Sequence, residues 1–311
     1  MRNLKGFWEV NKTKTLFFPA CPYPETRKKI LRANNVDFWV ETEGKGEPLI
    51  LIHGGPGGNH CYFHPGMSTL AAERKLVYYD LRGHYMSKCP QTPELCGLSY
   101  DVEDIESLRK KLGFKKIDLL GHSYGAIAAF AYALKYPANL INLVFCSAPV
   151  GITDEAASRR LELNPVSKKL TRAESEAEIK KLYYKLYFHN PVTPMALKYN
   201  EITRLAWRSL KNNKTVKCYE RDSAEISWRK NICKIKLPML FIFGKHDPLM
   251  DPDKSRKIIY KNNQARVVIF NKSGHDPFTD EPEYFFKIVN TFLGLKKGRG
   301  DAALRQAADF K

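Results

Sequence analysis

The chain has 311 residues, of which 43% are hydrophobic and 12% aromatic, and it carries a formal net charge of +18 at pH 7. This composition is typical of a globular protein and excludes an intrinsically disordered chain. The length allows one large α/β domain or two smaller ones. No apolar run approaches the roughly 18–20 residues of a membrane span, and the apolar run at 16–18 is too short for a signal peptide. We therefore expect a cytoplasmic protein.

The positive charge and the cysteines carry less information about function. Basic residues are spread along the chain, and no signature of a nucleic-acid-binding module is present. We interpret the charge as a basic soluble surface and expect no nucleic-acid partner. The seven cysteines are odd in number and include no CxxC pair, which indicates free thiols in a reducing compartment.

From residue 36 onward, short apolar runs alternate with helical patterns. The stretch 36–44 alternates and ends at glycine, which is typical of a hairpin strand. Continuous apolar runs, which we interpret as buried strands, follow at 47–55, 75–83, 115–123 and 140–151. Helical patterns lie between the later runs, at 100–113 and 124–137. This order predicts an α/β fold with a mostly parallel sheet.

The alternation stops at residue 151 and resumes near residue 236. Residues 151–235 are basic, contain many aromatic residues and have helical patterns without a clear buried strand. We interpret them as a helical cap over the carboxyl edge of the sheet, inserted into a core formed by residues 36–150 and 236–295. Residues 1–35 are then an N-terminal extension and residues 296–311 a tail.

Ser123 lies in "GHSYGA", where an apolar run passes into a helical pattern. A serine hydroxyl becomes a good nucleophile only when an oriented base removes its proton. Asp247 and His275 each follow a later apolar run, so all three side chains should emerge at one edge of a parallel sheet. Ser123 as nucleophile, His275 as base and Asp247 as orienting group therefore form a candidate catalytic triad.

An acyl-transfer site also requires N–H donors for the oxyanion of the tetrahedral intermediate. The backbone N–H of Tyr124, directly after the nucleophile, is one candidate. The glycine-rich loop "HGGPGG" at 53–58 follows a predicted strand and can direct a second donor, which we assign to Gly55.

With these motifs the chain resembles the α/β-hydrolase superfamily and, within it, the proline iminopeptidases. The resemblance covers residues 36–295, with the cap as its least similar part. It rests on "HGGPGG", "GHSYGA" and three further motifs: "DLRGHYMS" (80–87), "GKHDPLMDP" (244–252) and "SGHDPFTDEPEYF" (273–285). It implies an α/β-hydrolase fold without a cofactor, in which Ser123, Asp247 and His275 have the roles given above.

The resemblance also implies a substrate class, a small molecule or short peptide. A proline iminopeptidase-like enzyme would release N-terminal proline, or a similar small residue, from peptides or amides. Because "DLRGH" is equally typical of esterases, a capped carboxylesterase is the alternative, with a C–C hydrolase or an acyltransferase as further possibilities. A ligand-binding protein that retains only the fold is the non-enzymatic alternative.

An aminopeptidase must recognise a protonated α-amine with carboxylates. Some family members carry a glutamate just after the catalytic aspartate, whereas this chain has Pro248 there. Glu220 and Glu225 are the nearest candidates in the cap, with solvated surface acids as the alternative interpretation. Tyr184 and Trp207 are candidates for contact with an apolar or cyclic group, with cap packing as the alternative.

Three residues of "NHCYFH", His60, Cys61 and His64, have types that bind metals. A zinc site usually recruits a further ligand from a separate segment, and no partner cluster is evident in the sequence. We therefore expect no metal and predict that this stretch lines the pocket. Asp251 is predicted to cap a helix, and is not the orienting acid.

Overall fold

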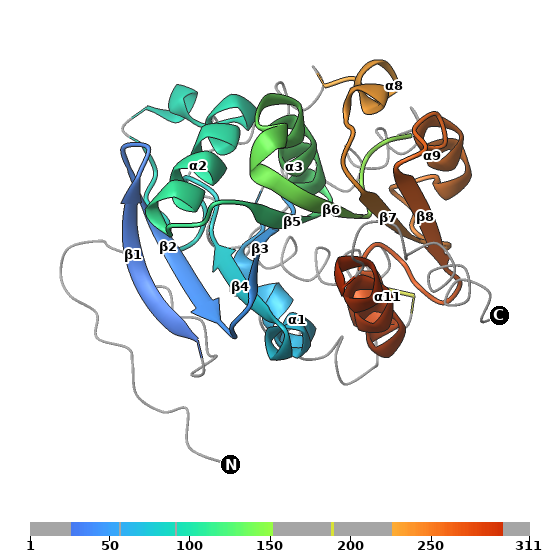
Figure 1. The fold of residues 1–311 in the computed structure, drawn as a ribbon, viewed down its shortest axis with the longest axis horizontal. Helices are drawn as coiled ribbons and strands as arrows, with labels where there is room; N and C mark the ends of the chain where they lie inside the picture. The colour runs from blue at the N-terminus through green and yellow to red at the C-terminus, as the bar shows by residue number, and fades with distance from the viewer. Residues whose placement is uncertain (1–25, 56, 91, 152–187, 190–225, 295–311) are drawn as a thin grey trace, which may run out of the picture.

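The computed structural model describes residues 26–55, 57–90, 92–151, 188–189 and 226–294. Its centre is an eight-stranded sheet with helices on both faces (Figure 1). The strands are β1 (Arg27–Ala33), β2 (Val36–Glu43), β3 (Glu47–Ile52), β4 (Arg74–Tyr79), β5 (Ile117–His122), β6 (Leu140–Cys146), β7 (Met239–Gly244) and β8 (Ala265–Phe270).

Across the sheet the strands follow the order β1-β2-β4-β3-β5-β6-β7-β8. Strands β3 to β8 pair in parallel, while β2 is antiparallel to both β1 and β4. The mostly parallel α/β sheet predicted from the alternation of apolar runs and helical patterns is confirmed. The carboxyl ends of β3 to β8 therefore meet at one edge, where open α/β sheets bind their ligands.

The helices are α1 (His64–Met67), α2 (Leu98–Lys111), α3 (Tyr124–Lys135), α8 (Trp228–Asn231), α9 (Pro252–Ile259), α10 (Pro277–Asp280) and α11 (Pro282–Gly294). Short 3-10 turns are η1 (His60–Phe63), η2 (Ser68–Ala72), η3 (Pro93–Leu95), η4 (Pro137–Asn139) and η7 (Ile232–Lys234). Among the described residues, no helix combines the length and the apolar character needed to cross a membrane.

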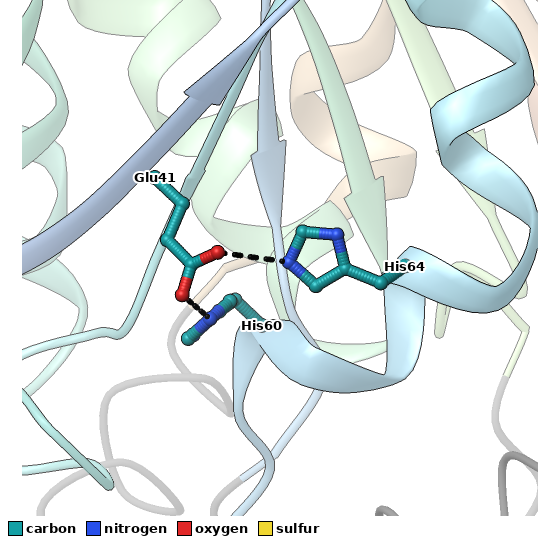
Figure 2. A group of neighbouring side chains, drawn as sticks. All are labelled: Glu41, His60 and His64. Atoms are coloured by element: carbon teal, nitrogen blue, oxygen red, sulfur yellow. Dashed lines mark hydrogen bonds and ion pairs between the residues drawn. The ribbon is translucent and has the colours of Figure 1, made fainter. Parts of the chain in front are cut away.

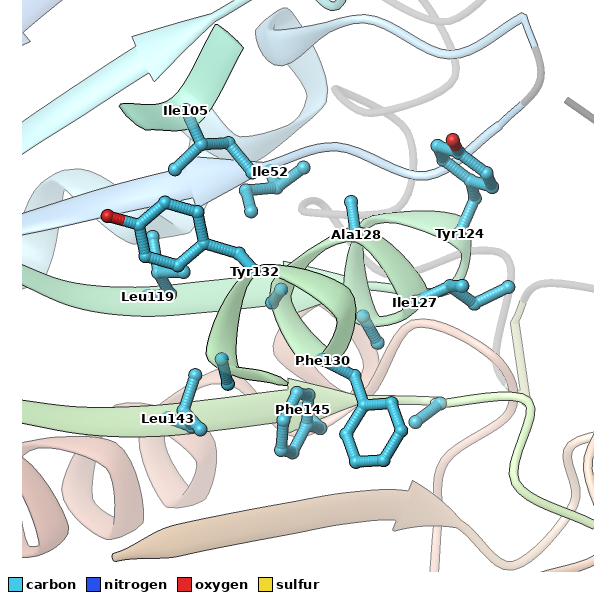
Figure 3. Packing of buried hydrophobic residues seen from close by; sticks show 14 of the residues in the cluster. Ile52, Ile105, Leu119, Tyr124, Ile127, Ala128, Phe130, Tyr132, Leu143 and Phe145 are labelled. Atoms are coloured by element: carbon cyan, nitrogen blue, oxygen red, sulfur yellow. The ribbon is translucent and has the colours of Figure 1, made fainter. Parts of the chain in front are cut away.

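Alternate residues of the strands pack into two cores, one on each face of the sheet. In β3, Ile50 and Ile52 face the core beneath α2 and α3, whereas Leu49 and Leu51 face the core beneath α1 and α11. Helix α3 is apolar around most of its circumference, because one side packs on β3, β5 and β6 and other sides pack on α2 and Trp228. Figure 3 shows its side chains packed against Ile52 of β3 and neighbouring strand residues.

The sheet begins earlier than the predicted core boundary at residue 36. Strand β1 pairs with β2 from Arg27 to Ala33, a segment that we expected to belong to an N-terminal extension. As an edge strand it is exposed over most of its length, with Ile30 56% exposed and Leu31 and Ala33 packed on the core, so it lacks the apolar alternation that reveals a half-buried strand. The other predicted domain boundaries fall near residues outside the described ranges and stay predictions.

Candidate active site

The turn between β5 and α3 places Ser123 in a strained backbone conformation. Its φ and ψ are 53° and −115°, in the positive-φ region that residues other than glycine rarely adopt. A Cβ on Gly121 would overlap the carbonyl oxygen of Gly125, and a Cβ on Gly125 would overlap that of Ile52. The Gly-x-Ser-x-Gly spacing is therefore a packing requirement of a turn that holds Ser123 at the carboxyl end of β5.

Asp247 and His275 lie on the turns that follow β7 and β8. The Nδ1 atom of His275 lies 2.7 Å from Oδ2 of Asp247, and both side chains are buried. The other carboxylate oxygen of Asp247 accepts N–H hydrogen bonds from Leu249 (2.8 Å) and Met250 (3.2 Å). Because an ionised carboxylate only accepts, we assign the proton to Nδ1 of His275, which leaves Nε2 able to accept another proton. This is the arrangement of an orienting acid and a general base.

Backbone contacts bring the turns of Ser123 and His275 to the same edge of the sheet. The N–H of Ser123 donates to the carbonyl oxygen of Cys146, the last residue of β6, at 2.9 Å. The hydroxyl of Ser147 donates to the carbonyl oxygen of His275 at 2.6 Å. The ring of His275 also lies 5.0 Å, centroid to centroid, from that of His122, the residue before Ser123.

The glycine-rich loop after β3 lies against the turn of Ser123, since a Cβ on Gly54 would lie 3.2 Å from Cβ of Ser123. His53 orients this loop: its Nδ1 lies 2.7 Å from the carbonyl oxygen of Gly54, and its Nε2 accepts the N–H of Leu81 at 3.0 Å. Burial and the nearby ring of His84 lower the pKa of His53 to about 3, so the imidazole is neutral. A neutral ring with Nδ1 protonated satisfies both hydrogen bonds.

A chain of hydrogen bonds connects the loop to the residues around His275. The hydroxyl of Tyr62 accepts the N–H of Gly54 at 2.5 Å and lies 2.9 Å from Nδ1 of His122. Nε2 of His122 lies 3.0 Å from Oδ1 of Asp276 and 3.2 Å from the carbonyl oxygen of His275. Since both of these oxygens only accept, Nε2 of His122 carries the proton and its Nδ1 accepts the proton of Tyr62.

The two predicted oxyanion donors occupy different environments. Gly55 is half-buried in the glycine-rich loop, and Tyr124 is the first residue of α3. The side chain of Tyr124 is buried and its hydroxyl donates to Asp101 of α2 at 2.6 Å. The phenol of Tyr124 is therefore engaged by the core, and its contribution to an oxyanion hole would come from its backbone.

The predicted substrate contacts in the cap lie outside the described residues: Glu220, Glu225, Tyr184 and Trp207. A neighbouring aromatic residue, Phe188, is described and is buried in the same core as Phe278 of α10. Asp251 accepts the N–H of Lys254 at 2.9 Å as the N-cap of α9, which confirms the predicted capping role.

The two histidines of the stretch "NHCYFH", which we predicted to line the pocket, are buried against β2. The side chains of His60 and His64 have no exposed surface and face Glu41 of β2. Cys61 is also buried. No partner for these residues is evident in the sequence, because the antiparallel pairing of β2 with β4 brings Glu41 to them.

Sequence reasoning missed Ser147 and Asp276 as neighbours of the site, and it placed Tyr62 there only as part of the stretch 59–64. Asp276 could have been suspected, because it directly follows His275. Ser147 carries no such signal: its φ of 49° and its contact with His275 arise from the turn after β6.

Comparison with known proteins identifies the family. A sequence profile of the alpha/beta hydrolase fold matches residues 47–282, which is more than half of the chain. The chain belongs to the α/β-hydrolase family. It is similar to a proline iminopeptidase of Saccharolobus solfataricus, with 28% identity over 286 residues that cover 86% of this chain and 92% of the relative.

Solved structures of α/β hydrolases share the fold. A carboxylesterase from Bacillus subtilis has a TM-score of 0.72 at 17% identity, and the alignment covers 88% of this chain and 93% of the esterase. A proline iminopeptidase from Mycobacterium smegmatis has a TM-score of 0.67 at 19% identity, covering 86% and 98%. Together with the sequence relatives, these matches support a serine hydrolase, as the motifs predicted.

Proposed function

We propose that Ser123, His275 and Asp247 form a catalytic triad that hydrolyses its substrate through an acyl-enzyme. The observation that carries this proposal is the 2.7 Å contact of His275 Nδ1 with Asp247, on turns held at the same sheet edge as the strained turn of Ser123. Loops at this edge are the usual site of chemistry in parallel α/β sheets.

In the first half of the reaction, Oγ of Ser123 attacks the substrate carbonyl carbon while Nε2 of His275 takes the hydroxyl proton. The tetrahedral oxyanion accepts hydrogen bonds from the backbone N–H groups of Gly55 and Tyr124. His275 then returns the proton to the leaving amine or alcohol as the bond to the carbonyl carbon breaks. Asp247 stays ionised and stabilises the imidazolium that forms in between.

In the second half, a water molecule attacks the acyl-enzyme carbonyl and gives one proton to His275. The second tetrahedral intermediate collapses with release of the carboxylic acid, and His275 returns that proton to Oγ of Ser123. The net reaction consumes one water and consists of hydrolysis of an amide or ester.

The preferred substrate in this proposal is a peptide or amide with N-terminal proline or a similar small residue. The relatives named as proline iminopeptidases support this choice. Residue 248 is proline and cannot pair with a substrate ammonium, an observation that favours the second candidate, a capped carboxylesterase acting on small esters. Glu220 or Glu225, outside the described residues, would have to pair with the amine in the peptidase.

A fluorophosphonate probe tests the triad. It should label the wild-type protein at Ser123, and Ser123→Ala should abolish labelling because the reacting oxygen is gone. His275→Ala should slow turnover by several orders of magnitude, since the general base is lost. Labelling that persists in Ser123→Ala would overturn the assignment of the nucleophile.

A side-by-side assay with proline p-nitroanilide, N-acetylproline p-nitroanilide and p-nitrophenyl acetate tests the substrate class. A peptidase that pairs the free amine with a carboxylate should cleave the first amide and spare the acetylated one, because a buried ammonium needs a partner. In that case Glu220→Gln or Glu225→Gln should raise KM steeply for the free amine. Turnover of the ester alone would identify the carboxylesterase.

A further inference from the structure

Glu41, His60 and His64 form a compact buried group beside the paired strands β2 and β4. Nε2 of His60 lies 3.0 Å from Oε1 of Glu41, and Nε2 of His64 lies 3.3 Å from Oε2 of the same carboxylate. All three side chains have no exposed surface. Figure 2 shows the two rings directed at the carboxylate, one at each oxygen.

The spacing of these atoms matches that of ligands on a single ion. One ligand atom from each residue can be chosen so that all three lie within 4.8 Å of one another. For bonds of about 2.0–2.1 Å in tetrahedral geometry, neighbouring ligand atoms are separated by about 3.3–3.4 Å. The nitrogens of His60 and His64 lie 3.0 and 3.3 Å from different oxygens of the carboxylate, so one shared ion requires Glu41 to bind through both oxygens or to turn one of them toward both rings.

The surroundings of the group hold the ligand atoms in binding orientations. Nδ1 of His60 lies 2.7 Å from Oδ1 of Asp80, which also accepts the backbone N–H of His60 at 3.0 Å. A carboxylate on the far nitrogen of a histidine keeps Nδ1 protonated and directs Nε2 toward a metal. Trp39 and Thr26 donate to the two oxygens of Glu41, at 2.8 and 2.5 Å, and so fix its carboxylate plane.

The charges of the group also call for a cation. His60 faces a carboxylate with each ring nitrogen, and ionised carboxylates only accept hydrogen bonds. The buried carboxylates of Glu41 and Asp80 therefore both face the ring of His60, and a cation bound at its Nε2 would balance their charge.

We propose that Glu41, His60 and His64 bind a divalent transition-metal ion, with zinc as the best match. Two imidazoles and one carboxylate form a ligand set typical of zinc, whereas magnesium and calcium prefer oxygen ligands alone. A fully buried position suits a structural ion and not a catalytic one that must meet substrate. The ion would fasten β2 to η1 and α1, the turns that directly follow the glycine-rich loop.

The test uses the full-length chain after dialysis against a chelator. Titration with Zn²⁺, followed by calorimetry, should show one tight equivalent, and Zn²⁺ should raise the midpoint of thermal unfolding. Co²⁺ in the same site should give a visible absorption spectrum that differs from that of the aqueous ion. Both readouts are independent of turnover, so they remain valid whatever the fate of the proposed triad.

Substitutions assign the site. His64→Gln should weaken Zn²⁺ binding at least about 100-fold, and Asp80→Asn, which removes only the support of a ligand, about 10–100-fold. His246→Gln is the matched control: it removes an imidazole from the exposed pair stacked with His189, the rings 4.2 Å apart, and should leave binding unchanged. Loss of binding in His246→Gln, or none in His64→Gln, would overturn the proposal.

If His64→Gln fails to fold, X-ray absorption at the zinc edge of the wild-type complex identifies the ligand atoms without a variant. A first shell of nitrogen and oxygen with imidazole scattering would support the assignment. A shell containing sulfur would mean that the ion binds Cys61, whose Sγ lies 3.7 Å from Nε2 of His60, or cysteines elsewhere, and would overturn the assignment to Glu41, His60 and His64. Absence of a tight Zn²⁺ equivalent in the wild-type chain would show that protons alone balance the buried group.

Discussion

The hydroxyl of Tyr62 connects the glycine-rich loop to His122. It accepts the N–H of Gly54 and lies 2.9 Å from Nδ1 of His122. We predict that Tyr62→Phe lowers kcat by about 10-fold with little change in KM, because the N–H of Gly54 loses its acceptor and the neighbouring oxyanion donor shifts. The free energy of unfolding should fall by about 1–3 kcal/mol, the cost of a buried N–H without a partner. Steady-state kinetics and urea unfolding measure the two effects.

Tyr260→Phe is the control for this prediction. Tyr260 is 61% exposed at the end of α9, so removing its hydroxyl should change neither kcat nor stability. A Tyr62→Phe variant with wild-type kcat would show that the loop is positioned without the hydrogen-bond chain. An increase in KM at unchanged kcat would instead indicate that Tyr62 acts in substrate binding.

His53 makes stability depend on pH. Its pKa is about 3 in the folded protein, through burial and the ring of His84, against about 6.5 when unfolded. The charges of Asp80 and the hydrogen bond to Gly54 act in the opposite direction but do not outweigh burial. Between about pH 7 and pH 5, His53 therefore becomes protonated in the unfolded chain but not in the folded one. This should lower the free energy of unfolding by about 2 kcal/mol at pH 5.

Urea unfolding of the wild type and of His53→Gln at both pH values measures this contribution. A glutamine can donate to Gly54 and accept from Leu81 without titrating, so the variant should lose about 2 kcal/mol less than the wild type on acidification. Equal losses in the two proteins would show that His53 does not carry the effect.

At the scale of elements, the close contact of α3 with β3 depends on Gly125. A Cβ at this position would overlap the carbonyl oxygen of Ile52 and approach that of His53, both of them backbone atoms that cannot turn aside. Gly125→Ala should therefore displace the start of α3 and lower the free energy of unfolding by about 1–3 kcal/mol or more. Because Ser123 lies two residues earlier, fluorophosphonate labelling should slow as well.

Gly294→Ala provides the matched glycine control. No atom lies within 4 Å of the position of a Cβ there, so the substitution should be neutral or slightly stabilising at the end of α11. Urea unfolding of both variants makes the comparison. A Gly125→Ala protein as stable as the wild type would contradict the packing role assigned to the second glycine of the motif.

The elements were predictable to different degrees, for physical reasons. Buried parallel strands such as β3 and β5 are mostly apolar and have a glycine at or just after their carboxyl end, so the sequence predicts both the strands and the residues that follow them, including Ser123. Strand β1 carries no such pattern, because an edge strand needs no apolar face on either side. The pairing of Asp247 with His275 was predicted from their positions after apolar runs, from chain order and from the resemblance.

Contacts that depend on strand register were not predictable. Glu41 lies opposite Tyr78 in the antiparallel pairing of β2 with β4, and the ring of His64 lies 4.2 Å from that of Tyr78. Nothing in the segment around Glu41 marks it as a partner for residues 60–64, since a shift of one residue would turn its side chain to the other face. The buried histidine and glutamate group is therefore a product of tertiary structure.

At the scale of the whole molecule, the net charge of +18 arises from 51 lysine and arginine residues against 33 aspartate and glutamate residues. A large charge of one sign destabilises the compact state through self-repulsion. The Debye length falls from about 30 Å at 0.01 M salt to about 10 Å at 0.1 M. We predict that the midpoint of thermal unfolding rises by a few degrees over this range of NaCl, which differential scanning calorimetry can measure.

A charge-reversed variant separates self-repulsion from other effects of salt. Lys29 and Lys45 are exposed, and replacing both by glutamate removes two positive charges and adds two negative ones, lowering the net charge from +18 to +14. If repulsion limits stability, Lys29→Glu/Lys45→Glu should unfold at a higher temperature than the wild type at about 0.01 M salt. The difference should shrink at about 0.1 M, because salt then screens the repulsion in both proteins. A variant that is less stable at low salt, or a difference that salt leaves unchanged, would mean that the basic residues are balanced locally and that their sum does not govern the stability of the fold.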